Sequence, residues 1–344
     1  MRKIILFSVF IVILLAVTGN VFAQRGSAAA ETLEVRIASP LPAASPWGRT
    51  LDRIAAEWSR VTNGQVRLRA LHGGTEGSED KMMLSLAGNT IQAALLTSFG
   101  LSSIEPSILT VSSPFLIRND EELAVVMREL QGGLETRINS GNYFILAWSQ
   151  AGFVHVFSRE PVIVPADLRR LRIGSNSEAS DLNNIFKAMG YQIVEADWGD
   201  VGNMLNAGQI SAIYQNPAAI AAVQLHTVVR NMLPVNIAPV IGGIVINQQT
   251  WRRIGQLNPR YQTELLRATR RIAEEFDATM PRTINDAIQS MSRTGLTVNR
   301  LSPAQEQQWY SEFERAMPSL LGTAFDIELY QNINNILIRH RGGR

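Results

Sequence analysis

Residues 33–71 read LEVRIASPLPAASPWGRTLDRIAAEWSRVTNGQVRLRAL and contain a complete strand–helix–strand pattern. Apolar side chains at 33–37 alternate with polar ones, which is the period of two of a β-strand. Apolar residues at helical spacing follow over 51–61, and Asn63 and Gly64 tolerate the left-handed backbone common at a helix end. The last six residues alternate again. Two strands joined by a helix imply parallel pairing, so this stretch predicts an α/β fold.

The same order of strands and helices repeats further along the chain and gives two α/β units in tandem. The expected elements are helices over about 79–87 and 182–189, strands at 93–97, 171–175, 191–195, 210–214 and 238–246, and a long extended stretch at 143–158. The last third is helical. A long helix begins near Tyr261, and Pro281 should kink or break it. Ser302, Pro303 and Gln305 form a capping-box start for a further helix.

The first 23 residues have the layout of a secretory signal peptide. Arg2 and Lys3 precede an apolar run over 4–17, and a small-residue cleavage site ends at Ala23. The run is shorter than the ~20 residues that a membrane span needs. We therefore expect cleavage after Ala23, a periplasmic protein, and a flexible lead-in over 24–32, with an uncleaved N-terminal anchor as the alternative.

The composition is that of a globular chain of 344 residues, with 46% hydrophobic and 18% charged residues. At ~100–200 residues per domain, this length predicts about two domains. The chain has 32 Lys and Arg against 30 Asp and Glu, and two of those cations lie in the first 23 residues, so the remainder is balanced. Binding to nucleic acid rests on clustered uncompensated cations, so nucleic acid is not an expected partner.

No pattern in the sequence predicts catalysis, a metal site or a cofactor. There is no cysteine, which excludes thiolate nucleophiles and cysteine-bound metals. The glycine-rich nucleotide motifs are absent, and the four histidines are too scattered for a zinc motif. Only His155 lies in an apolar, strand-like run, where a histidine in a pocket wall is commoner than a metal ligand. We expect a protein that is not an enzyme.

Four stretches, in this order, resemble the motifs of the solute-binding proteins of TRAP (tripartite ATP-independent periplasmic) transporters, the DctP-like family. They are SPFLIR at 113–118, VPADLRRLRI at 164–173, WGDV at 198–201 and QNP at 215–217. The resemblance covers nearly all of 33–330. It implies a two-lobed periplasmic-binding-protein fold, class II-like, that closes on a small molecule by hinge motion. It also implies a receptor that delivers its ligand to the membrane permease subunits of a TRAP transporter.

The implied lobes exchange segments of the chain. We expect lobe I over 33–151 and about 243–280, and lobe II over 152–242 and about 281–335. The long helix and the helical C-terminal segment should bridge both lobes. Residues 336–344 are expected as a loose basic tail.

Two positions depart from the family pattern in a way that bears on the ligand. Most family members bind organic acids through an arginine directly after the second motif, and Gly174 occupies that place. A second arginine, common in the strand before it, is replaced by Val154. A carboxylate is costly to bury without a paired cation. We therefore expect an uncharged or largely hydrophobic ligand.

The resemblance and the aromatic residues around these two positions suggest a set of ligand-binding candidates. They are Thr97, Phe99, Trp148, Phe153, Val154, His155, Gly174, Trp198, Tyr214 and Asn216. Among them, His155, Tyr214 and Asn216 should supply a few orienting hydrogen bonds. An arginine introduced at Gly174 is expected to fill the pocket without unfolding the protein.

Other functions remain open at this point. One is an organic-acid receptor whose arginine comes from elsewhere, such as Arg172 or Arg159. Another is an exported signalling or protein-interaction subunit of the same fold, with an additional periplasmic partner protein. An enzyme is third, and it would need a nucleophile or carboxylate pair that the sequence does not offer.

Overall fold

A computed structural model describes residues 32–175, 180–196 and 198–342. The expected signal peptide, its cleavage site and nearly all of the lead-in lie outside the described residues. Within these ranges, no helix has both the length and the apolar character needed to cross a membrane.

Lobe I is built on three parallel strands that the sequence predicts. They are β1 (Leu33–Ala38), β2 (Val66–Leu71) and β3 (Ala93–Thr97). Its helices are α2 (Pro46–Val61), α3 (Glu79–Ala87), α4 (Ser98–Ser102), η1 (Pro106–Ser112), α5 (Asp120–Asn139) and α10 (Gln248–Leu257). Helix α2 begins at the Ser45 cap, whose side chain accepts a hydrogen bond from the Gly48 backbone. It buries Trp58 completely, and the indole Nε1 donates to Thr269 Oγ1 at 2.8 Å.

Lobe II repeats the pattern with shorter strands. Its strands are β5 (Arg172–Ser175), β6 (Gln192–Glu195), β7 (Ala212–Gln215), β8 (Asn231–Met232) and β10 (Thr297–Val298). Its helices are α6 (Pro165–Arg169), α7 (Ser180–Ala188), α8 (Val201–Asn206), α9 (Pro217–Ala222), η3 (Leu225–Thr227) and α12 (Pro303–Leu320). Strand β5 pairs in parallel with both β6 and β7, as crossover helices require.

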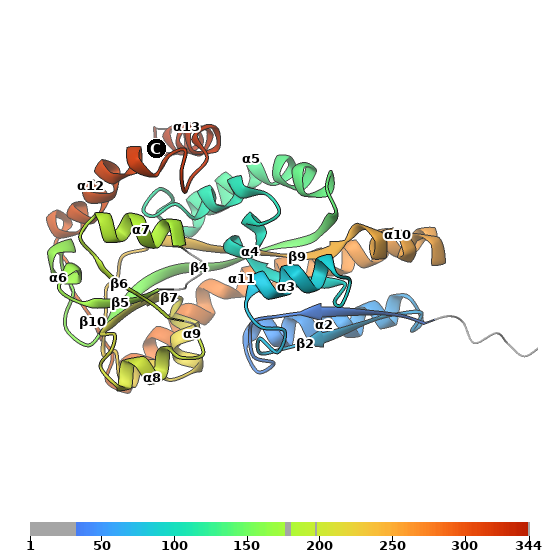
Figure 1. Ribbon diagram of the computed structural model, residues 1–344, viewed down its shortest axis with the longest axis horizontal. Helices are drawn as coiled ribbons and strands as arrows, with labels where there is room; N and C mark the ends of the chain where they lie inside the picture. The colour runs from blue at the N-terminus through green and yellow to red at the C-terminus, as the bar shows by residue number, and fades with distance from the viewer. Residues whose placement is uncertain (1–31, 176–179, 197, 343–344) are drawn as a thin grey trace, which may run out of the picture.

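Three long elements join the lobes: β4 (Tyr143–Ser158), β9 (Ala238–Asn247) and α11 (Pro259–Arg293). The main sheet runs in the order β2-β1-β3-β9-β4-β7-β5-β6, so β9 and β4 lie at its centre. Both run antiparallel to the neighbours that belong to the lobes, β3 and β7. Figure 1 shows α11 passing behind the sheet from one lobe to the other.

Buried side chains form two apolar clusters in each lobe. Those of lobe I lie on the two faces of its sheet, one beneath α2 and the first part of α11, the other beneath α5. Those of lobe II lie beneath α12 and beneath α8 and α9. Along α11, Ile284 still packs against a cluster of lobe I, whereas Ile288 packs against a cluster of lobe II. The helix therefore passes from one lobe to the other within a single turn.

The SPFLIR stretch lies between η1 and α5 of lobe I and packs against lobe II. Phe115 has a positive φ of 61°, which is rare for a residue with a side chain. Its ring packs among Trp309, Tyr310 and Phe313 of α12 in lobe II. Its backbone N–H donates to the Ile237 carbonyl at 2.6 Å. These contacts over-determine a strained backbone conformation.

Two expectations about the helical third differ from the structure. Pro281 lies inside α11, which runs through to Arg293, so the expected break does not occur, and the kink stays a prediction. Residues 336–342 of the expected loose tail are instead the end of a helix, α13 (Ile327–Gly342), which lies beside α5 (Figure 1), and 343–344 lie outside the described residues. Its Arg341 pairs with the buried Glu122 at 2.8 Å. The apolar face of this helix packs against lobe I. The basic residues at the end of the helix favoured a loose tail over this interpretation.

Candidate ligand-binding site

The strand directions place the carboxyl ends of the two sets of parallel strands face to face. Strand β4 runs from lobe I into lobe II, and through β9 it has the same direction as β3. Strand β7 runs antiparallel to β4, and β5 and β6 run parallel to β7. The ends of β1–β3 therefore point toward lobe II, and those of β5–β7 point toward lobe I. Ligands of open α/β sheets bind outside the carboxyl ends of the strands, so this junction is the candidate site.

On the side of lobe II, a buried polar network lies at these strand ends. Ser175, the last residue of β5, donates to Asn183 Oδ1 in α7 and lies 2.7 Å from the Tyr214 hydroxyl in β7. Asn183 is fully buried and Ser175 nearly so. Burial raises the pKa of Tyr214, partly opposed by the Ser175 hydrogen bond, so the phenol is neutral. The network offers a hydroxyl oxygen and no charge.

On the side of lobe I, the end of β3 is organised by a buried carboxylate. Glu79 accepts hydrogen bonds from the Thr97 backbone and hydroxyl, both at 3.0 Å, and from the Gly100 N–H at 2.7 Å. Thr97 in turn caps α4 by accepting from the Phe99 N–H at 3.3 Å. Phe99 packs against the lobe II cluster that also contacts Tyr214. Thr97 and Phe99 thus lie where the two lobes meet.

His155 lies in β4 directly beside β7 and is only 8% exposed. Its Nδ1 lies 3.3 Å from the Leu233 carbonyl. Burial lowers its pKa to about 4, although the backbone carbonyls of Leu233 and Val235 favour the protonated form. The ring is therefore neutral at neutral pH and adds no positive charge to the junction.

The surroundings of Gly174 are apolar. A Cβ atom there would lie 2.7 Å from Ile210 Cδ1 and 3.3 Å from Ile213 Cγ2. Both isoleucines belong to a buried cluster of lobe II. An arginine side chain would therefore begin against these isoleucines and displace them, so we expect the substitution to destabilise lobe II and not merely to fill a pocket. Val154, the other position without an arginine, is half-buried and pairs with Ala238 of β9.

The remaining candidates lie in different surroundings. Trp148 and Phe153 are buried in a cluster of lobe I, and the Trp148 Nε1 donates to Glu135 at 3.2 Å. Trp198 is 41% exposed. Asn216 caps α9, where its Oδ1 accepts from the Ala218 N–H at 2.8 Å, and its Nδ2 donates to the Ala151 carbonyl. The structure thus gathers Thr97, Phe99, Tyr214 and His155 near the junction and gives Trp148 and Phe153 a core role.

Arg159 and Arg172, the two candidates for a relocated arginine, lie at the opposite end of the lobe II sheet. Arg159 follows β4 and Arg172 begins β5, which are both the ends distant from lobe I. Their guanidinium groups donate to the carbonyls of Leu205 and Gly208, at the end of α8. Neither side chain reaches the candidate site.

In the part of the chain that the structure describes, the connections that follow the facing strands contain no Lys or Arg. They are residues 39–45, 72–78, 196, 198–200 and 216, and they contain two acids. The first cations that follow the connections of lobe I along the chain are in the first turns of α2 and α3, at Arg49 and Lys81. The exposed Arg49 donates to the Ala44 carbonyl. Sequence reasoning missed this property because it becomes visible only when the strand directions are known.

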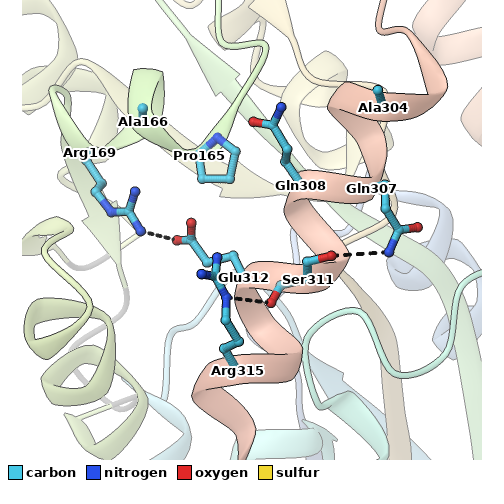
Figure 2. A pocket seen from close by; sticks show the side chains of 9 residues that line it. All are labelled: Pro165, Ala166, Arg169, Ala304, Gln307, Gln308, Ser311, Glu312 and Arg315. Carbon is cyan, nitrogen blue, oxygen red and sulfur yellow. Dashed lines mark hydrogen bonds and ion pairs between the residues drawn. The ribbon is translucent and has the colours of Figure 1, made fainter.

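A surface hollow of about 260 Å³ lies elsewhere, between α6 and α12 (Figure 2). Its main charges are already paired, because Arg169 binds Glu312 at 2.6 Å and Tyr191 donates to the same carboxylate. Helix α6 precedes β5, so the hollow lies at the end of this strand that points away from lobe I. It is separate from the candidate site. Among the described residues, no group of His, Asp and Glu side chains could hold a metal ion.

Comparison with known proteins identifies the family. The model of bacterial extracellular solute-binding protein family 7, DctP, matches residues 37–321. The chain belongs to this family. Family 7 comprises the solute-binding proteins of TRAP transporters, so the resemblance drawn from the four motifs is confirmed.

Solved structures of family 7 share the fold. A TRAP periplasmic solute-binding protein of Shewanella oneidensis with bound succinate has a TM-score of 0.81 at 14% identity, covering 89% of this chain and 99% of that one. The corresponding protein of Xanthobacter autotrophicus Py2, with bound β-D-galacturonate, has a TM-score of 0.77 at 16% identity, covering 88% and 98%. The expected two-lobed α/β fold is confirmed.

A relative in sequence covers less of the chain. The 2,3-diketo-L-gulonate-binding periplasmic protein YiaO of Escherichia coli K12 is 26% identical over 153 residues, which is 44% of this chain and 46% of that protein. The chain thus matches about half the length of this curated relative.

Proposed function

We propose that this chain is the periplasmic receptor of a TRAP transporter and binds an uncharged, largely hydrophobic small molecule between its lobes. It would deliver this ligand to membrane permease subunits. The observation that carries the ligand class is the absence of Lys and Arg from the connections after the facing strands. Organic acids are usually held by charge-assisted pairs with arginine, and a buried carboxylate without such a pair is costly.

The interior of the candidate site supports the same ligand class. At Gly174 the atoms nearest to where a side chain would begin belong to the apolar residues Ile210 and Ile213. Tyr214 and Ser175, two of the polar groups near the junction, are neutral hydroxyls that contact each other. A few fixed hydrogen-bonding groups among apolar side chains are typical of sites for uncharged ligands. Succinate and galacturonate, bound by the two structural relatives, are carboxylates and would lack a partner here.

The test is to identify what the protein carries and what it accepts. The chain, exported to a bacterial periplasm and purified without denaturant, is examined by native mass spectrometry and its solvent extract by chromatography with mass detection. We expect a co-purifying neutral molecule, removed by unfolding and restored on refolding in its presence. The control is a Tyr214→Phe, Ser175→Ala double variant, which should bind it at least about tenfold more weakly, since two hydrogen bonds are lost.

Carboxylates provide the opposing outcome. Succinate and galacturonate are titrated into refolded, ligand-free protein by calorimetry. Tight binding of either would overturn the proposal, and loss of that binding in Arg49→Ala would identify Arg49 as the cation that replaces the family arginine. An Arg172→Ala variant is the matched control, because Arg172 lies at the distant end of β5.

A further inference from the structure

Strand β4 has a bulge near the boundary between the lobes. Gln150 pairs with Ile241 and Phe153 pairs with Pro239, so two residues of β4 stand opposite one residue of β9. One of these two is Gly152, with a φ of 78°. A bulge interrupts the ladder of hydrogen bonds and bends the strand.

Two side chains take up backbone groups at the bulge. Asp277 of α11 accepts from the Gln150 N–H at 3.0 Å and from the Ser149 hydroxyl at 2.9 Å, both at Oδ1. Asn216 donates its Nδ2 to the Ala151 carbonyl. Buried backbone groups need such partners, so these side chains substitute for the missing ladder.

The two side chains come from different lobes. Asp277 follows Phe276 on the part of α11 that packs in lobe I. Asn216 caps α9, which packs in lobe II against the later part of α11. Between them, Gly152 has the side chain of Ile284 directly beneath it, in the turn where α11 changes lobes. Strand β4, at Gly152, and helix α11, at Ile284, thus pass from one lobe to the other side by side.

We propose that this bulge is the pivot of lobe closure and that Asp277 and Asn216 are its positioning residues, Asp277 holding it to lobe I and Asn216 to lobe II. The proposal rests on the proposed function in that closure serves ligand capture. Burial raises the pKa of Asp277 to about 6 against the lowering effect of its two hydrogen bonds. Either protonation state keeps Oδ1 as an acceptor, so the contact does not require the charge. It also gives Asn216 a role other than ligand contact.

The test measures the distance between the lobes without any ligand. The chain has no cysteine, so Leu84→Cys in α3 and Val223→Cys in α9, both at exposed positions, can carry spin labels specifically. We expect Asp277→Ala to broaden the distribution of label distances at least about twofold and to speed exchange of the Gln150 amide about tenfold, as loss of its hydrogen bond to Oδ1 implies. Asp277→Asn keeps an acceptor and should restore the wild-type width.

The control is Asp286→Ala, an exposed acid further along the same helix. A distribution in Asp277→Ala equal to that of the wild type would overturn the proposal. So would equal broadening in Asp286→Ala, or an Asp277→Asn variant as broad as Asp277→Ala. Because ligand-free protein is used, these outcomes are independent of which ligand class the receptor accepts.

Discussion

Two glycines of the central sheet, Gly174 and Gly152, lie within strands for opposite reasons. At Gly174 the backbone is ordinary and the neighbours are the buried side chains of Ile210 and Ile213. At Gly152 the backbone has a positive φ, and the neighbours are the hinge side chains Ile284 and Asn216. The first glycine leaves room for apolar core side chains at the position where the resemblance to the family implies an arginine. The second permits a bend where the lobes join.

We infer from this comparison that ligand choice depends on lobe II around Gly174, and that lobe movement depends on the boundary around Gly152. Gly174 lies inside lobe II and shapes what that lobe can present, whereas Gly152 lies between the lobes and shapes how they turn. Substitutions at the two positions should therefore fail in different ways, and the failures can be told apart.

The largest effect is expected for Gly174→Arg. Its side chain must enter an apolar cluster with no paired anion, so the free energy of unfolding should fall by about 4 kcal/mol or more. Urea unfolding followed by circular dichroism measures this. Gly132→Arg, at an exposed glycine of α5 with open space around it, is the matched control and should be neutral or stabilising. A Gly174→Arg protein as stable as the wild type would mean that the side chain escapes into the junction.

The dependence of the free energy of unfolding on pH should show the contribution of His155, which lies three residues beyond Gly152 in the sequence. Its folded pKa of about 4 lies below the unfolded value, so its contribution is present above pH 6.5 and lost as the pH falls toward 4. The loss is on the order of 3 kcal/mol. The pKa of Asp277 is raised to about 6, so its contribution has the opposite sign and is lost as the pH rises from about 4 to 6.

The two slopes oppose each other in the wild type, and His155→Gln removes one of them. We expect the stability of this variant to fall less steeply than that of the wild type as the pH falls from 6 to 4, measured by urea unfolding at each pH; His226 and Glu122, whose pKa values are also lowered, still lose stability in acid. A variant whose stability falls with acid as steeply as that of the wild type would contradict the assignment to His155.

A smaller effect is expected for Gly152→Ala, which should lower the free energy of unfolding by about 2 kcal/mol through backbone strain and crowding of Ile284. Gly208→Ala separates the two causes, because Gly208 has a φ of 68° and no atom within 4 Å of its Cβ position. If crowding contributes, adding Ile284→Ala to Gly152→Ala should cost less than the sum of the single changes. Strict additivity would leave backbone strain as the only cause.

The smallest effect is expected for Tyr214→Phe, about 1 kcal/mol, since one neutral hydrogen bond to Ser175 is lost while the ring stays in place. Thermal unfolding suffices to measure it. No change in stability would indicate that Ser175 finds another partner.

The order of strands and helices could be predicted because apolar periodicity is local. Strand direction could not, since nothing in the residues of 238–247 tells that β9 runs against β3. Pro281 was expected to kink or break a helix that in fact continues, because packing along α11 supports the helix beyond it. At the site, Gly174 and Val154 were visible as missing arginines. The partners Ser175, Asn183 and Glu79 were not, because their contacts cross between elements.

The last helix completes the core of the first lobe. Ile333, Ile336 and Leu337 of α13 are buried in the same cluster as residues of β3 and α5. Contacts between segments so distant in the chain form late and slowly in folding. A polypeptide threaded through a membrane from its N-terminus would hold lobe I unfinished until its final turns emerged. Lobe I would therefore remain incompletely folded during translocation, and the protein would reach its full stability only after translocation is complete.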